Sequence, residues 1–203
     1  MSRTLSNLDP SQLRPAAGVL ARAFRDNPGT LALMRGCSKE RRLELNLRVA
    51  WGLVRCAHRY GIVTGAFVDS RLVGVSLAFA PGTYPPPILG QLLMALGPLS
   101  TGPRMARRYA LIDQHMRRHH LHRPHYYLSM LGVEPDEQGR GHGSALLKEH
   151  VALADRDHVD CYLETDKPES VRLYEGFGYA VTREDVLREL SDLRFWTMTR
   201  GVR

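Results

Sequence analysis

Apolar and polar residues alternate with two different periods along this 203-residue chain, and the two periods distinguish helices from strands. Apolar residues that recur every three or four positions predict helices, and short β-branched or aromatic runs predict strands. Asn27-Pro28-Gly29 is expected to end the first helix, and Gly61 the second. The first half is predicted to hold a strand over 4–8, helices over 9–26 and 38–60, and a hairpin over 62–80 that turns at Asp69-Ser70.

One apolar stripe with helical spacing runs along the expected second helix and should face the core. Its members are Leu43, Leu47, Ala50, Val54 and Ala57.

The second half should continue as an alternation of helices and strands. Strand, helix, strand near the centre predicts a parallel βαβ unit with a right-handed crossover. No repeat or linker divides the chain, so a single α/β domain over 1–203 is expected. The predicted elements are a helical region over 88–120 broken near Gly97-Pro98 and Gly102-Pro103, a strand over 125–133, a helix after Gly143, a strand over 159–165, a short helix over 170–177 and two final strands.

Composition is that of an ordinary soluble globule, with 43% apolar and 24% charged residues. The three cysteines are scattered and form no CxxC pair, so neither a disulfide framework nor a zinc site is expected. The N-terminus lacks a secretory signal pattern. The longest apolar stretch, over 88–99, is shorter than a membrane span needs. These features predict a cytoplasmic protein with no membrane partner.

Basic residues are concentrated in one segment of a chain whose formal net charge is +7. Residues 104–125 hold six arginines and five histidines against the single acid Asp113. Two interpretations are open: attraction of a polyphosphate or acidic ligand, or a solvated helix face. No nucleic-acid partner is expected, because neither a helix-turn-helix pattern nor aromatic interleaving accompanies the charge.

A glycine-rich loop, GVEPDEQGRGHGS over 132–144, joins an apolar strand to a helix. Such a loop presents backbone N–H groups beside the positive end of the helix dipole. Gly139, Gly141 and Gly143 let an anion approach closely, and the guanidinium of Arg140 suits phosphate. With Ser144 in the first turn of the helix, this pattern predicts a pyrophosphate cradle. The dinucleotide pattern GxGxxG fails, because Ser144 stands at its third glycine, and no lysine completes a P-loop.

Two segments resemble motifs of the GNAT N-acetyltransferases. VEPDEQGRGHGSALL is similar to motif A, in which Q/R-x-x-G-x-G/A follows V-x-P, and Gln138, Gly141 and Gly143 fill its core. CYLETDKPESVRLYEGFGY is similar to motif B. The chain most resembles the puromycin N-acetyltransferase-like members, through AF-x-D/N-x-P at 23–28, His-Arg-Pro before the fourth strand, LET in the fifth and a final W-T-M-T-R.

The resemblance implies a GNAT fold and acetyl-CoA as acyl donor. The fold would be a central mixed, mostly antiparallel twisted sheet, splayed between its fourth and fifth strands and flanked by helices. Leu131 and Val133 would hydrogen-bond the pantetheine arm, with a β-bulge near Gly132 helping the strands to part. The expected acetyl-CoA residues are Leu131, Gly132, Val133, Gln138, Gly139, Arg140, Gly141, His142, Gly143, Ser144, Ser170 and Tyr174.

The implied chemistry is attack of a neutral amine on a thioester, with a backbone N–H near Leu131 stabilising the oxyanion. Tyr174 stands where the family keeps its general acid. Because tyrosine has a pKa of about 10 and a thiol of about 8.5, Tyr174 is expected to donate a strong hydrogen bond unless a neighbour lowers its pKa. The alternative is a packing tyrosine that contacts Val171 or Phe177.

The general base is less constrained, because the fourth strand carries no carboxylate before its end. Glu164 on the fifth strand is the predicted catalytic carboxylate, and Glu134 is a second candidate. The remaining candidates are His125 and the surface-helix cluster His115, His119, His120 and His122. No metal-ligand spacing is recognised, so no metal site is expected.

A small primary amine is the expected acceptor. The segments expected to recognise it are the turn after the first helix, the insertion over 81–118 and the loop near 183–193. The alternatives are a protein or peptide amine, a non-catalytic acetyl-CoA-binding module and, third, a basic nucleic-acid-binding protein. The assembly is expected to be a monomer or a homodimer.

Overall fold

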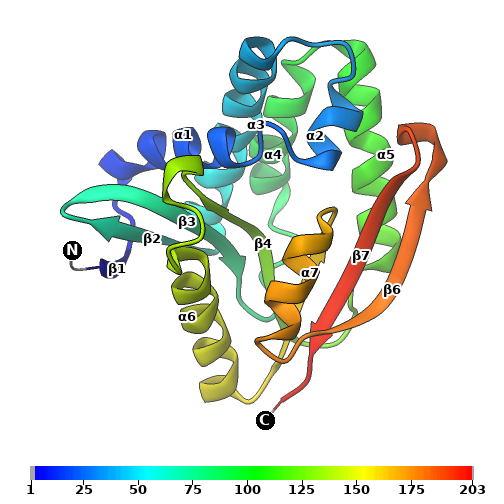
Figure 1. The fold of residues 1–203 in the computed structure, drawn as a ribbon. Coiled ribbons are helices and arrows are strands. Elements are labelled where there is room, and N and C mark those ends of the chain that lie inside the picture. The colour runs from blue at the N-terminus through cyan, green and yellow to red at the C-terminus, as the bar shows by residue number, and fades with distance from the viewer. Residues whose placement is uncertain (1–2, 203) are drawn as a thin grey trace.

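The computed structural model describes residues 3–202 and builds them around one twisted seven-stranded sheet (Figure 1). The strands lie in the order β1-β2-β3-β4-β5-β7-β6, and every neighbouring pair is antiparallel except β4 and β5. This is the mixed, mostly antiparallel sheet that the sequence predicted. The strand bounds are β1 Arg3–Asn7, β2 Ile62–Val68, β3 Arg71–Phe79, β4 His125–Val133, β5 Asp160–Thr165, β6 Ala180–Leu187 and β7 Leu193–Arg200.

Helices cover both faces of this sheet (Figure 1). On one face α1 and α3 share a core with Tyr127 of β4, and on the other α6 and α7 share a core with Leu128 of the same strand. The two cores follow from the alternation of side chains along β4. None of the described helices is long and apolar enough to cross a membrane. The helix bounds are α1 Leu13–Ala23, α2 Pro28–Leu33, α3 Lys39–Tyr60, α4 Ile88–Leu99, α5 Pro103–His119, α6 His142–Asp157 and α7 Pro168–Glu175, with 3₁₀ turns at Pro10–Gln12, Pro135–Glu137 and Arg188–Leu190.

The central βαβ unit is confirmed, because α6 carries the chain from β4 to the parallel strand β5. The β2–β3 hairpin is also confirmed. Asp69 and Ser70 form its turn with φ angles of 46° and 69°. Positive φ at both central residues matches the right-handed twist of the flanking strands.

Two helix boundaries differ from the prediction. The expected helix over 9–26 is a 3₁₀ turn followed by α1, and Pro28 begins a further short helix, α2. Proline is tolerated at the first helical position because its missing N–H would be unsatisfied there anyway. The predicted break at Gly97-Pro98 is wrong, because α4 continues through it and ends before Gly102, whose φ is 99°.

The stripe on α3 is correct only in its C-terminal half. Ala50, Val54 and Ala57 are buried, whereas the Leu47 residue is 37% exposed and Leu45 is buried in its place. The N-terminal half of α3 packs against α2 through Leu45, so its buried face is turned away from the stripe that faces the sheet.

His150 on α6 is a buried histidine whose ring nitrogens both lack a hydrogen-bond partner among the described residues. Burial lowers its pKa from 6.5 to about 4, and the positive charge of Arg200 adds to the shift. A depressed pKa means that the neutral ring stabilises the fold above pH 6.5. That contribution is lost as pH falls towards 4, because the unfolded state then binds the proton more readily.

We therefore expect the free energy of unfolding to fall by about 2 kcal/mol between pH 7 and pH 5 through His150 alone. Urea unfolding of wild type and His150→Leu at both pH values measures this, and the loss should be smaller by that amount in the variant. His122→Leu, at an exposed position, is the control and should keep the wild-type pH dependence. An equal pH dependence in wild type and His150→Leu would contradict the expectation.

Candidate functional site

β4 and β5 separate part-way along their length and leave a wedge in the sheet. They pair only between 125–128 and 160–163. Beyond that point the described part of β4 pairs with β3 alone, and Glu164 and Thr165 of β5 pair with β7. The predicted splay is therefore confirmed. A cavity of about 410 Å³ occupies the wedge, lined by both strands, the glycine-rich loop and α7.

The β-bulge lies at a different residue from the one predicted. Leu77 is opposite Met130 and Ala78 is opposite Leu128, so Ser129 is the extra residue in β4. Gly132 pairs regularly with Val75. The bulge comes directly after the last residue that pairs with β5, which is where a local bend helps β4 to leave its neighbour.

Backbone groups of Leu131 and Val133 face the wedge. The N–H of Glu134 donates to the carbonyl of Val73 on β3 at 2.8 Å. Because successive residues of a strand present their backbone groups to opposite edges, Leu131 and Val133 point away from β3. The side-chain Nε2 of Gln138 donates to the Val133 carbonyl at 3.1 Å, which agrees with this orientation.

The glycine-rich loop delivers the N-terminus of α6 to the same cavity. Gly139 and Gly141 have φ angles of 77° and 80°, which other residues adopt at a cost. No side chain caps α6 within the described chain. Since the first N–H groups of a helix have no partner inside it, those of 142–144 are available to an anion.

Arg140 is the one predicted acetyl-CoA residue that does not line the cavity. Its guanidinium Nη1 lies 3.0 Å from Oε2 of Glu137. Glu137 is buried and also contacts Arg71 of β3 and Nε2 of His142, the latter at 3.4 Å. Sequence reasoning missed Glu137, which ties the loop to the sheet through a partner 66 residues away. The other eleven predicted residues line the cavity together: Leu131, Gly132, Val133, Gln138, Gly139, Gly141, His142, Gly143, Ser144, Ser170 and Tyr174.

Tyr174 of α7 is buried at the inner wall of the cavity. Burial raises its pKa above the usual 10, and the negative charge of Asp166 adds to this. No neighbour lowers the pKa, so the hydroxyl stays protonated and can donate a hydrogen bond. Tyr174 also packs on Tyr179, with ring centroids 5.9 Å apart.

Glu164 and Glu134 have different surroundings. The Glu164 side chain is 4% exposed, accepts a hydrogen bond from the Tyr162 hydroxyl at 2.8 Å and lines the cavity. His120 Nδ1 lies 3.8 Å from the same carboxylate. Glu134 instead forms a two-pronged ion pair with Arg22 of α1. That pair occupies Glu134, which leaves Glu164 as the candidate carboxylate inside the wedge.

The histidines of the basic segment do not act as one cluster. The His120 ring packs at an angle against His125 and edge-on against Tyr162, close to Glu164, and burial lowers the pKa of His125. His122 is exposed in the loop after α5. His115 and His119 lie on α5 beside Asp185 of β6, away from the wedge.

A second cavity of about 510 Å³ adjoins the first, and Asp166 lines both. Asp166 is half-buried, its carboxylate accepts the backbone N–H of Gly29, and burial raises its pKa. The positive charge of the neighbouring Lys167 offsets part of this rise. The other residues that line the second cavity are mainly apolar, with two arginines and an aspartate among them: Pro28, Leu31, Ala32, Arg35, Pro168, Leu190, Ser191, Asp192, Leu193, Arg194 and Trp196.

Asp166 was missed by sequence reasoning because its environment is tertiary. The Gly29 contact joins α2 to the end of β5 across 137 positions. The only local signal was an acid directly after LET in motif B.

Residues 38–179 match the acetyltransferase (GNAT) family. A stretch of 61 residues is 44% identical to a mycothiol acetyltransferase from Kineococcus radiotolerans, covering 29% of this chain and only 20% of that relative's length.

Similar solved structures include one from Corynebacterium glutamicum described as "histone acetyltransferase HPA2 and related acetyltransferase", with a TM-score of 0.74, 18% identity and coverage of 100% of this chain and 98% of the other. Arylalkylamine N-acetyltransferase 2 from Aedes aegypti has a TM-score of 0.67 at 12% identity, with both chains fully covered. The PaiA N-acetyltransferase from Thermoplasma acidophilum, in complex with coenzyme A, has a TM-score of 0.60 at 16% identity and covers 99% of each chain. These likenesses show the fold.

Proposed function

Because the chain belongs to the acetyltransferase (GNAT) family, we propose that it transfers an acetyl group from acetyl-CoA to the primary amine of a small molecule, by direct attack in a ternary complex. The observation that carries the proposal is the wedge between β4 and β5. It places a free strand edge beside an uncapped helix N-terminus. The free strand edge can hydrogen-bond an extended pantetheine arm, and the helix N-terminus can bind a diphosphate.

Eleven residues of the wedge would hold the donor without rearrangement. The carbonyl of Leu131 and the N–H of Val133 would bond the pantetheine arm, since Gln138 already engages the Val133 carbonyl. The N–H groups at the start of α6 would bind the diphosphate. Arg140 would join them only after leaving Glu137, and its side chain, 59% exposed, has room to do so.

Three groups of the chain would act on the reacting atoms. The donor supplies an activated thioester. The N–H of Leu131 faces the wedge and would stabilise negative charge on the carbonyl oxygen. Tyr174 would donate a hydrogen bond to the departing sulfur. Glu164 would accept the proton that an alkyl ammonium must lose, a step that costs roughly 4–5 kcal/mol at pH 7.

The second cavity would bind the acceptor, with Asp166 holding its ammonium group. Burial disfavours the charged carboxylate and Lys167 offsets this only in part, so a ligand cation would supply a direct partner. Asp166 opens onto both cavities, so an amine held there lies at the entrance to the wedge. Leu31, Leu190 and Trp196 would contact an apolar body attached to that amine.

The apolar walls favour a monoamine over a polyamine. Arg35 and Arg194 line the same cavity, and only Asp192 offers a second carboxylate there. Names of similar structures include arylalkylamine, agmatine and polyamine acetyltransferases, which supports a small amine as a class, so the preference for a monoamine rests on the walls of the cavity. The puromycin-like features of the sequence also favour an amine with a bulky apolar part.

Replacing Asp166 by asparagine tests the acceptor site. Asparagine keeps a carbonyl oxygen for the Gly29 N–H and removes the charge, so the fold should persist. Losing a charged hydrogen-bond partner costs about 1.5–3 kcal/mol, so the KM for the amine should rise about tenfold to a hundredfold while the Kd for acetyl-CoA stays unchanged. Steady-state kinetics and calorimetry measure the two quantities.

Asp192→Asn is the matched control, because Asp192 lines the same cavity and is exposed. Its KM should stay within about threefold of wild type. An unchanged KM in Asp166→Asn, or an equal rise in both variants, would exclude the proposed role of Asp166.

An amine library screened with acetyl-CoA, followed by release of free thiol, tests the function itself. Small apolar monoamines should react, and peptides with free N-termini or lysines should not. Turnover of peptides alone would instead support a protein N-acetyltransferase. Binding of acetyl-CoA with no reacting amine would support a non-catalytic module.

A further inference from the structure

Two histidines of the basic segment meet a carboxylate from another element. His115 and His119 are one turn apart on α5 and share one face of that helix. Asp185 approaches them from β6, and the three ligand atoms lie within 4.8 Å of one another. We propose that His115, His119 and Asp185 bind a divalent transition-metal ion, and Zn²⁺ is the ion chosen to test this.

One of the ligand–ligand distances matches that of a tetrahedral site. Nε2 of His115 lies 3.3 Å from Oδ2 of Asp185. Zinc–nitrogen and zinc–oxygen bonds of about 2.0–2.1 Å place neighbouring ligands of a tetrahedron about 3.3 Å apart. The rings of His115 and His119 meet edge to face with centroids 4.8 Å apart, and a ligand nitrogen of His119 lies within 4.8 Å of the other two ligand atoms.

His115 carries an unsatisfied polar atom at the centre of this group. Its Nε2 is buried and has no hydrogen-bond partner within residues 3–202, although Asp185 is near. A buried polar atom without a partner costs free energy, and a bound cation would satisfy it. The absence of a metal site was expected only because no ligand spacing was recognised. The folded chain supplies that spacing by bringing β6 to α5.

The ligand chemistry selects the kind of ion. Two neutral imidazoles and one carboxylate suit Zn²⁺, Co²⁺, Ni²⁺ or Cu²⁺, whereas Ca²⁺ and Mg²⁺ require a shell of oxygen atoms. Three protein ligands leave a fourth position for water.

Arg183 competes for the same carboxylate. It forms a two-pronged ion pair with Asp185, in which Nη2 lies 2.9 Å from Oδ1. The Arg183 side chain is 47% exposed, so it can turn into solvent when a metal takes Oδ2. An exposed ion pair of this kind is worth up to about 1 kcal/mol, which is small beside a metal–ligand bond.

A metal here would join α5 to the β6–β7 hairpin. Next to the site, Ile112 and Met116 of α5 already pack on Leu190 and Leu193. Those two leucines also line the second cavity. Metal binding would therefore stiffen the wall of that cavity without touching the wedge.

Calorimetric titration of the EDTA-treated full chain with ZnCl₂ tests the site, with the visible spectrum of bound Co²⁺ reporting its geometry. We expect saturable one-to-one binding, a tetrahedral Co²⁺ spectrum and a higher Tm with zinc. Asp185→Asn and His115→Ala should each weaken binding at least about tenfold. Arg183→Ala should tighten it by up to about fivefold, because it removes the competitor.

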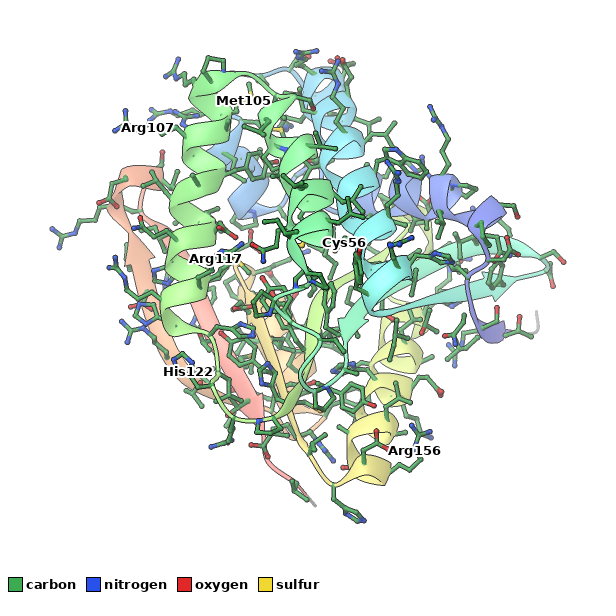
Figure 2. All side chains as sticks on the ribbon, turned by 180° about the vertical axis from the view of Figure 1, so that it is seen from behind. Cys56, Met105, Arg107, Arg117, His122 and Arg156 are labelled. Carbon is green, nitrogen blue, oxygen red and sulfur yellow. The ribbon has the colours of Figure 1, made fainter. Side chains whose placement is uncertain are left out.

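His122→Ala is the control, since His122 lies in the loop beyond α5 and outside the group (Figure 2). It should bind zinc as wild type does. Circular dichroism of the metal-free variants checks that each is folded. Lack of saturable zinc binding in wild type would overturn the proposal, and so would wild-type affinity in both Asp185→Asn and His115→Ala.

Discussion

Tyr174→Phe should lower kcat for acetyl transfer by about a hundredfold and leave the Kd for acetyl-CoA unchanged. A positioned proton or hydrogen-bond donor typically contributes 10²–10⁴-fold to such reactions. We expect the lower end, because burial raises the pKa of Tyr174 and makes full proton transfer to the sulfur unfavourable. Thiol release at saturating donor and acceptor measures kcat, and calorimetry measures Kd.

Tyr179→Phe is the matched control for this variant. Tyr179 is the neighbouring buried tyrosine, it does not line the cavity, and its hydroxyl has no partner among the described residues. Its removal should leave kcat within about threefold of wild type. Wild-type turnover by Tyr174→Phe would show that Tyr174 only packs against its neighbours.

Gly141→Val should weaken acetyl-CoA binding at least about tenfold. Gly141 has a φ of 80° directly before α6, and a β-branched residue there is strained by roughly 1–2 kcal/mol. The side chain would also cover the N–H groups on which a diphosphate must rest. The strain lowers the stability of the free and the bound protein alike, whereas covering the N–H groups acts on the bound state, where a loss of 1.4 kcal/mol already corresponds to tenfold.

Gly82→Val separates strain from the loss of the binding surface. Gly82 has a φ of 76°, and a Cβ there would meet nothing within 4 Å. It does not line the wedge cavity. This variant should lose similar stability and retain acetyl-CoA binding. Equal Kd values for Gly141→Val and wild type would mean that the diphosphate does not rest on this loop.

Much of the fold was predictable because its signals are local. The Asp69-Ser70 turn and the strand–loop–helix unit around Gly139–Ser144 are encoded in neighbouring residues. The order of these units then predicted the parallel pair, and the resemblance to the GNAT family implied its splay. α2 was missed because proline was read only as a helix terminator, although Pro28 occupies a first helical position that favours it.

Parts of the site could not be predicted because they depend on tertiary contacts. Glu137 looked like a loop acid, yet Arg71 of β3 makes it a buried anchor that also holds Arg140. Asp166 gains its position from the N–H of Gly29. Asp185 approaches α5 only because the β6–β7 hairpin folds against it. Each of these contacts joins residues that are far apart in the chain, and the hydrophobic periodicity of the sequence does not indicate them.

In the proposed mechanism, Glu164 and Asp166 would have different roles that the sequence could not assign. Glu164 is held by the Tyr162 hydroxyl inside the wedge, whereas Asp166 opens onto both cavities. The first is therefore suited to accept a proton, and the second to hold an ammonium group.

Calorimetric titration with acetyl-CoA and with acetyl-pantetheine, which lacks the diphosphate, tests the binding wedge most directly. We predict saturable one-to-one binding of acetyl-CoA and at least about tenfold weaker binding of acetyl-pantetheine, because the latter cannot use the N–H groups at the start of α6. Equal affinity for both compounds, or no heat from millimolar acetyl-CoA, would contradict the existence of a diphosphate-binding site in this loop.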